Sequence, residues 1–212
     1  MPDRMDRAKG EERLDRRCIP AHGGYRKLRS FQTAQLVYDG TVIFCERFLA
    51  KTSRTYDQMV QAARSGTQNI AEGSMASATS KKMELKLTGI ARASLEELAL
   101  DYEDFLRQRG LNLWEKNSPK AAAVREKYKE NKLDKSDKSD RSDRSDRLDK
   151  ENLYHFQTAD PETAANTMIC LIHQASFLLG RQIQKLEERF LRDGGFSERL
   201  SRERTKARKE RS

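Results

Sequence analysis

The stretch from Gln58 to Ser74, QMVQAARSGTQNIAEGS, decides the predicted fold. Small or apolar residues recur along it at steps of three and four, which places them on one side of a helix. A side built from small groups lets a second backbone approach more closely than a leucine-lined side does. Such a helix suits the middle of a bundle or a contact between subunits. The residues on this side are Met59, Ala62, Ala63, Gly66, Ile70 and Gly73.

Polar residues and a glycine mark the end of this helix. Gly73 stands where a left-handed C-terminal cap is expected, so the helix is predicted over residues 56–72. Asn69 and Glu72 are polar groups of its last turn. Because a glutamate at a helix C-terminus opposes the helix dipole, Glu72 needs a partner elsewhere in the fold. We interpret these residues as structural rather than catalytic.

The same stretch resembles the signature of the intervening-sequence four-helix bundle family. The motif Asn69-Ile-Ala-Glu-Gly73 is preceded by Gln61-Ala-Ala-Arg-Ser65 and followed by Ala91-Arg-Ala-Ser94-Leu95-Glu-Glu-Leu98. The resemblance extends over residues 23–130 and 160–205 to a longer branch with an added C-terminal suffix. The further matching segments are Gly23-Gly-Tyr-Arg-Lys27, Asp101-Tyr-Glu-Asp-Phe105, Met168-Ile-Cys-Leu-Ile172 and Gly194-Gly-Phe-Ser-Glu-Arg199.

This resemblance implies a fold, an assembly and candidate partners. Members of the family are often encoded inside intervening sequences of large-subunit ribosomal RNA genes. The family implies a four-helix bundle that forms a homopentamer. A relative, the accessory variability protein of diversity-generating retroelements, binds nucleic acid and a reverse transcriptase through a basic surface. The family has no catalytic signature to transfer to this chain.

The composition favours one modest domain with solvated segments. The chain has 212 residues, of which 35% are charged, and its mean hydropathy is −0.92. It holds no run of eighteen apolar residues and no apolar segment typical of a secretion signal, so we expect a soluble protein without a membrane role. Three widely spaced cysteines, Cys18, Cys45 and Cys170, favour a reducing cytoplasm over a disulfide framework.

Long helical periodicity without alternating strand patterns predicts an all-α protein, an antiparallel up-down four-helix bundle. Helices are expected over residues 30–49, 56–72, 80–109 and 160–190, with a short helix over 119–130 whose Val124 and Tyr128 face inward. The predicted organisation is a disordered N-terminal arm (1–22), the first three bundle helices with the short helix (23–130), a low-complexity linker (131–159), the fourth helix (160–192) and a basic suffix (193–212).

Local signals support several of these helix ends. Ser80 is a plausible N-cap, and Asp160 followed by Pro161 is another. Gly110 is expected to end the third helix. Gly40 would weaken an exposed helix by about 1 kcal/mol relative to alanine, which indicates close packing there. Residues after the third helix and in the suffix are expected to fold back onto the core, namely Leu111, Leu113, Trp114, Phe196 and Leu200.

The predicted third helix carries an apolar band wider than one helix pair requires. Ser94 is the small polar exception within it. A lone bundle would expose part of this band, so we expect one side to face the core and the other a neighbouring subunit. The band comprises Met83, Leu87, Ile90, Ala91, Ser94, Leu95, Leu98, Tyr102, Phe105 and Leu106.

Charge is concentrated at the chain ends. The net charge is +9, of which residues 1–30 contribute +4 and residues 187–212 contribute +3. Between them, residues 134–150 repeat Asp-basic-Ser with six acidic and six basic residues, so this segment has no net charge and is not expected to be the main nucleic-acid contact. The sharpest basic run is Arg199 to Arg211, which is either a solubilising helix end or a phosphate contact.

No catalytic or metal site is predicted, and no cofactor. Cys170 and His173 are spaced one helical turn apart, but no second ligand pair completes a tetrahedral zinc site. The Glu-x-x-His pairs of two-metal bundles are absent from the sequence. The acidic residues Glu96, Glu97, Asp101, Glu103 and Asp104 indicate a solvated or salt-bridged face.

Two functions from different classes therefore remain. The first is a non-enzymatic homo-oligomer, a pentamer by resemblance, that binds RNA or DNA as an accessory or scaffold protein. The second is a structural or protein-interaction module without a nucleic-acid role. The candidate nucleic-acid-binding residues are Arg202, Arg204, Lys206, Arg208 and Lys209, followed by Lys81, Lys82 and Lys86; the structural motif residues are Asn69, Glu72, Gly73 and Ser94.

Overall fold

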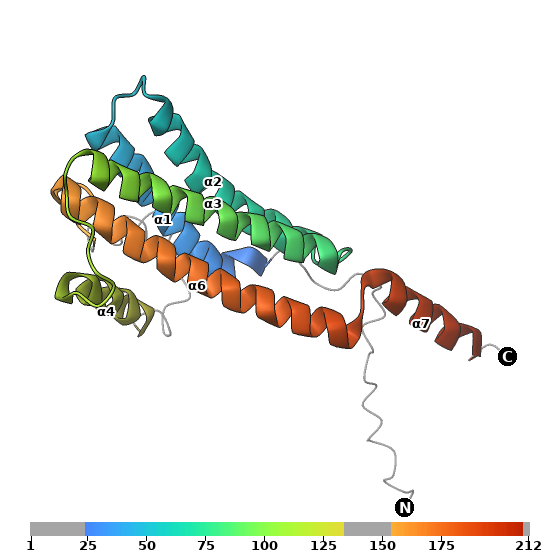
Figure 1. Ribbon diagram of the computed structural model, residues 1–212. Coiled ribbons are helices and arrows are strands. Elements are labelled where there is room, and N and C mark those ends of the chain that lie inside the picture. The colour runs from blue at the N-terminus through green and yellow to red at the C-terminus, as the bar shows by residue number, and fades with distance from the viewer. Residues whose placement is uncertain (1–23, 134–153, 210–212) are drawn as a thin grey trace, which may run out of the picture.

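The computed structural model describes residues 24–133 and 154–209, and every regular element within them is helical (Figure 1). This confirms the all-α prediction for that part of the chain. The predicted N-terminal arm and the Asp-basic-Ser repeat lie outside it. The elements are the 3-10 helix η1 (Gly24–Lys27) and the α-helices α1 (Arg29–Phe48), α2 (Arg54–Ala76), α3 (Lys81–Gln108), α4 (Pro119–Leu133), α6 (Pro161–Asp193) and α7 (Phe196–Lys209).

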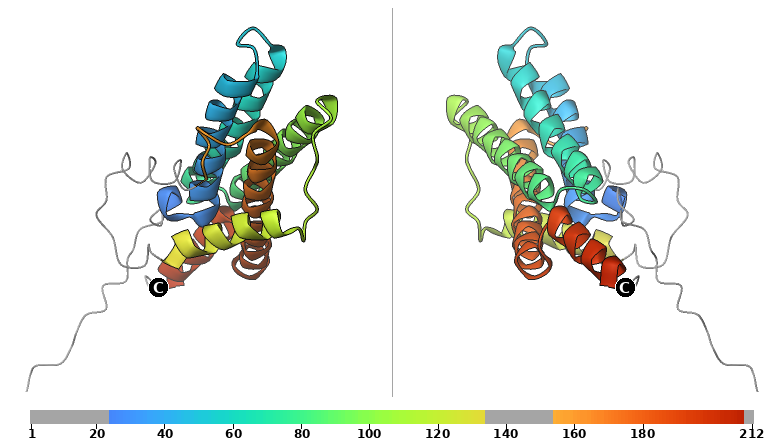
Figure 2. Two further views of the ribbon diagram at one scale, coloured as in Figure 1. Left: turned by 90° about the vertical axis from the view of Figure 1, so that its left-hand side faces the viewer. Right: turned by 90° about the vertical axis from the view of Figure 1, so that its right-hand side faces the viewer.

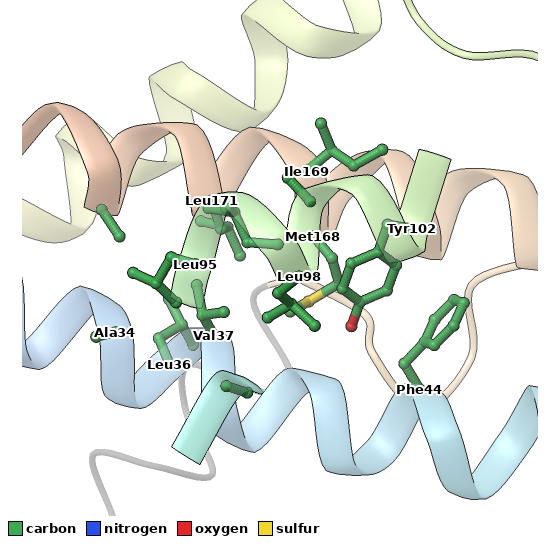
Figure 3. Close-up of a cluster of buried hydrophobic side chains, with 14 of the residues drawn as sticks. Ala34, Leu36, Val37, Phe44, Leu95, Leu98, Tyr102, Met168, Ile169 and Leu171 are labelled. Carbon is green, nitrogen blue, oxygen red and sulfur yellow. The ribbon is translucent and has the colours of Figure 1, made fainter. Parts of the chain in front are cut away.

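Four long helices surround the hydrophobic core. α1 and α3 each pack against both α2 and α6, and the shorter α4 packs against α6. Figure 3 shows Leu98 of α3, Val37 of α1 and Met168 of α6 pointing toward one another in this core. All three are almost completely buried. Since each long helix presents one apolar stripe inward, the periodic pattern of the sequence is explained by this shared core.

Three helix ends follow the predicted capping signals. Ser80 Oγ accepts a hydrogen bond from the backbone N–H of Met83 at 3.1 Å, and Asp160 Oδ1 accepts one from Thr163 at 3.0 Å. The bond from Thr163 lowers the pKa of Asp160, because it stabilises the carboxylate. After α3, Gly110 adopts a positive φ of 64°, as a helix-ending glycine does.

The predicted end of α2 was wrong. The helix continues beyond Glu72 to Ala76, and Gly73 is a buried residue inside it rather than a left-handed cap. A Cβ atom at Gly73 would lie 3.3 Å from the Leu87 Cβ and 3.4 Å from the Glu84 carbonyl oxygen of α3. Gly73 is therefore needed for the close approach of α3.

A second glycine of α2, Gly66, also lets α3 approach closely, about two turns before Gly73. A Cβ atom at Gly66 would lie 2.9 Å from Cγ of Leu95, which is completely buried. Beside this contact, the hydroxyl groups of Ser65 and Ser94 form a hydrogen bond of 3.0 Å. The small-residue side of α2 thus faces α3 at two glycines, as the sequence pattern indicated.

The predicted linker is shorter than residues 131–159. Its first three residues belong to α4, and residues 154–159 form a turn that inserts Tyr154 and Phe156 into the core. Arg47 of α1 holds this turn by donating hydrogen bonds to the carbonyl oxygens of Phe156, at 2.5 Å, and Ala159, at 2.7 Å. The turn was missed because its contacts with Arg47 and Gly40 of α1 join residues that are far apart in the sequence.

The expected close packing at Gly40 is confirmed by this turn. A Cβ atom at Gly40 would lie 3.0 Å from the ring of Phe156 and 2.7 Å from Sδ of Met168. The missing side chain of Gly40 therefore makes room for both α6 and the 154–159 turn against α1.

The segment between α3 and α4 covers one side of α6. Leu111 and Trp114 pack against the core as expected, whereas Leu113 is exposed, contrary to the prediction. Asn166 of α6 fixes the segment, because its side chain accepts a hydrogen bond from the backbone N–H of Trp114 at 2.7 Å and donates one to the Asn112 carbonyl at 2.8 Å. The leucine points outward since the backbone on both sides of it is held by Asn166.

The predicted short helix is confirmed as α4. Val124 is buried, and Tyr128 is half-buried with its hydroxyl group 2.7 Å from that of Thr33 in α1.

Within residues 24–133 and 154–209, no helix is long and apolar enough to cross a membrane.

Replacing Gly66 with alanine tests the approach of α2 to α3. Gly66→Ala should leave the protein about 1–3 kcal/mol less stable than Gly89→Ala, because only the first adds a methyl group to a filled space. Gly89 is the matched control: it lies in α3 with nothing within 4 Å of an added Cβ, and both variants gain the same helix propensity. Urea unfolding measures the difference, and equal stabilities would contradict the tight contact.

Candidate nucleic-acid interface

The basic suffix is a separate helix at the end of α6. Gly194, with a φ of 70°, ends α6 and donates its backbone N–H to the Phe190 carbonyl at 3.0 Å. Glu198 then accepts a hydrogen bond from Gly195 N–H at 3.1 Å in the first turn of α7. Because the glycine turns the chain, α7 is offset from the end of α6 and extends away from the long helices (Figure 1).

Five candidate phosphate ligands lie on α7, and all are exposed. Their spacing puts Arg202, Lys206 and Lys209 on one face of the helix, whereas Arg204 and Arg208 share another. α7 contains six basic residues and two acidic ones, which gives it a net charge of +4. The helix thus presents positive charge around most of its circumference.

The expected docking of Phe196 and Leu200 onto the core was wrong. Both side chains are partly exposed, and neither belongs to the hydrophobic core of the residues that the structure describes. Charged residues lie three or four positions away from them along the helix. The apolar strip that they form is therefore too narrow to bury α7.

The three candidate lysines lie at the start of α3. Lys82 and Lys86 are exposed, whereas Lys81 forms an ion pair of 2.9 Å with Glu84 of the same helix. Figure 1 places this helix start and α7 toward the same end of the long helices, and the right-hand view in Figure 2 looks at that end. The structure therefore collects two of the predicted basic groups at one end, with Lys81 already paired.

The structural motif residues lie along the contact of α2 with α3. Asn69 donates hydrogen bonds to the carbonyl and the hydroxyl oxygen of Ser65, at 2.9 and 3.1 Å, and that hydroxyl bonds to Ser94. Glu72 differs from this group: it is exposed, and its side chain forms no hydrogen bond or ion pair with any residue that the structure describes. The expected partner of Glu72 is therefore not found.

The two cysteine thiols that the structure describes both have raised pKa values. Burial, with smaller effects of Asp101 and Glu46, raises the pKa of the Cys45 thiol to about 12. Burial also raises the pKa of Cys170. Since the thiolate is the nucleophile and the metal ligand, both thiols are poorly suited to either task. No group of three or more His, Cys, Asp or Glu residues that could hold a metal ion occurs in the described part of the chain.

The acidic residues of α3 form the charged surface that was predicted. Glu96 pairs with Arg92 at 3.9 Å, and Asp104 pairs with Arg107 at 2.7 Å. Partial burial, followed by the nearby Glu97 and Asp104, raises the pKa of Asp101. These carboxylates give the middle of α3 a negative charge, whereas its first turn is positively charged. The basic surface is therefore confined to the start of the helix.

One polar site was missed by the sequence reasoning. An open pocket of about 290 Å³ lies between η1, α1 and α2, with Arg26 and Arg64 among its lining residues. Both arginines occupy outward positions of their helices, where an isolated charged residue is ordinary. No local pattern marks the two as neighbours, so only the packing of η1 against α2 reveals them.

Comparisons of this chain with protein-family models, with curated proteins and with solved structures found no match.

Removing residues 194–212 tests whether α7 is independent of the core. The shortened chain should keep its free energy of unfolding within about 0.5 kcal/mol, because none of the deleted residues that the structure describes belongs to the core. Phe156→Ala in the full chain is the comparison, and its loss of a buried ring should cost about 3–5 kcal/mol. A comparable loss on truncation, measured by denaturant unfolding, would show that α7 packs on the core.

Proposed function

We propose that this chain is a non-enzymatic, homo-oligomeric helical protein that binds RNA or DNA through α7 and the start of α3. The exposed α7, with its net charge of +4 outside the hydrophobic core, is the observation that carries the proposal. Each phosphate that a lysine or arginine neutralises releases condensed counterions, which favours binding. Lys82 and Lys86 add charge near the N-terminus of α3, whose helix dipole also favours phosphate.

The proposed architecture is an antiparallel, up-down four-helix bundle made by α1, α2, α3 and α6. The reciprocal packing of these four helices supports it, since each contacts two of the others. The resemblance of residues 23–130 and 160–205 to the intervening-sequence family favours the same arrangement.

Self-association is the second part of the proposal. Met83 and Leu100 of α3 are exposed by 44% and 63%, and Phe177 of α6 by 59%. Large apolar side chains left in water favour a contact with a second copy. A pentamer, the number favoured by the family resemblance, would carry a charge of about +45 and bind a polyanion through several weak contacts at once.

The same exposed apolar residues support a second candidate function. In this alternative the protein is a structural or interaction module, its ligand is another protein such as a reverse transcriptase, and α7 only keeps the assembly in solution. Aromatic and methionine side chains are enriched at protein interfaces, which gives Phe177 and Met83 a role in this alternative. A measurement of nucleic-acid binding distinguishes the two candidate functions.

Neutralising two lysines of α7 tests the first function. Lys206→Gln with Lys209→Gln should weaken binding to a single-stranded oligonucleotide at low salt. It should also lower the slope of log K against log salt by about 1.4, which is 0.7 for each lost phosphate contact. Fluorescence anisotropy at several salt concentrations measures both quantities.

Lys51→Gln with Arg54→Gln is the matched control for this experiment. It removes the same charge at the turn between α1 and α2, at the opposite end of the long helices from α7 (Figure 1). The proposal predicts an unchanged slope for this variant. Absence of binding by the unaltered protein at low salt would favour the interaction module instead.

A further inference from the structure

Most of the surface of the pocket between η1, α1 and α2 is polar, and its deepest lining residues are buried. Phe31, Thr67 and Ala71 line it and are buried. The Thr67 hydroxyl group is satisfied within the protein, since it donates to backbone carbonyl oxygens of Ala34 and Ala63, both at 3.3 Å. The pocket volume of about 290 Å³ is near the lower end of the range for small-molecule sites, about 300–1,000 Å³.

Aromatic rings form the walls of this pocket. Tyr25 and Tyr38 are half-buried lining residues. The ring of Tyr25 packs edge-on against Phe31 with centroids 4.8 Å apart, and the guanidinium group of Arg26 lies over this ring, 5.6 Å from its centroid. Rings held in place in this way suit the flat face of a planar, unsaturated ligand.

The rim supplies positive charge and amide groups. Arg26 and Arg64 are exposed lining residues, and no carboxylate belongs to the lining. Arg64 forms no ion pair with any residue that the structure describes. Guanidinium groups bind phosphate with two parallel hydrogen bonds. Gln35 and Gln68, also exposed at the rim, can donate and accept hydrogen bonds along the edge of a base.

We propose that this pocket binds a nucleoside monophosphate. The base lies against Tyr25 and Tyr38, its edge meets the glutamine amides, and the phosphate reaches out to Arg26 and Arg64. The open mouth lets the phosphate remain partly solvated. No residue of α7 lines this pocket, so the site goes beyond the proposed polyanion contact and does not depend on it.

Isothermal titration calorimetry of the full chain with AMP, adenosine and inorganic phosphate tests this site. AMP should bind at one site per chain, at least tenfold more tightly than either adenosine or phosphate, because only AMP uses the walls and the rim together. Arg64→Gln should weaken AMP binding about tenfold or more, through the loss of a charge-assisted hydrogen bond. Arg26→Gln provides a second variant with the same expectation if Arg64→Gln does not fold.

Arg181→Gln is the matched control, since Arg181 is an exposed arginine of α6 that does not line the pocket. It should leave AMP binding unchanged, and so should Lys206→Gln with Lys209→Gln in α7. No binding of AMP would overturn the proposal. Equal affinities for phosphate and AMP would also overturn it. So would an equal loss of AMP affinity in the Arg64 and Arg181 variants, because either result would show attraction to net charge alone. If the protein binds AMP but does not bind an oligonucleotide, the proposed function is contradicted and the AMP site is supported.

Discussion

The structure depends on the close approach of α2 to α3, which is set by the absence of side chains at two glycines. Gly66 lies against the buried Leu95, and Gly73 lies against the backbone of α3 near Glu84. Dispersion contacts are individually weak and fall off steeply with distance, so helices that approach closely gain many of them. A larger side chain at either glycine would separate the two helices and open the core that α1 and α6 complete. The Ser65–Ser94 hydrogen bond adds a polar contact whose position fixes how the two helices face each other.

The core and the basic suffix occupy separate parts of the chain. The apolar stripes of four helices are used inside, whereas the basic suffix is set apart by the turn at Gly194. Positive charge at one end can meet a polyanion without disturbing the packing, because α7 contributes no residue to the core. The pocket lined by Arg26 and Arg64 is of another kind, since its shape depends on how η1 packs against α1 and α2. One chain can therefore combine an adaptable charged helix with a preformed small site.

Periodicity and capping predicted most of the fold because both are local properties. Ser80, Asp160 and Gly110 act within one turn of their own position, and their predicted roles are confirmed. Gly73 was misassigned because a cap and a close helix contact both require glycine, and only the position of α3 decides between them. Phe156 was missed since the α1 residues beside it, Gly40 and Arg47, are distant in sequence. At the candidate site, the exposure of the α7 residues followed from their composition, whereas the joint pocket of Arg26 and Arg64 required the folded chain.

Native-state hydrogen exchange of the full chain, followed by mass spectrometry, tests most directly whether the α2–α3 contact organises the fold. Amides that open only on global unfolding mark the most stable unit of a protein. The account predicts that the slowest exchange occurs in residues 63–70 of α2 and 91–98 of α3, and that α7 exchanges early. It would be contradicted if those segments of α2 and α3 exchanged well before α6, because the core would then be stable without their contact.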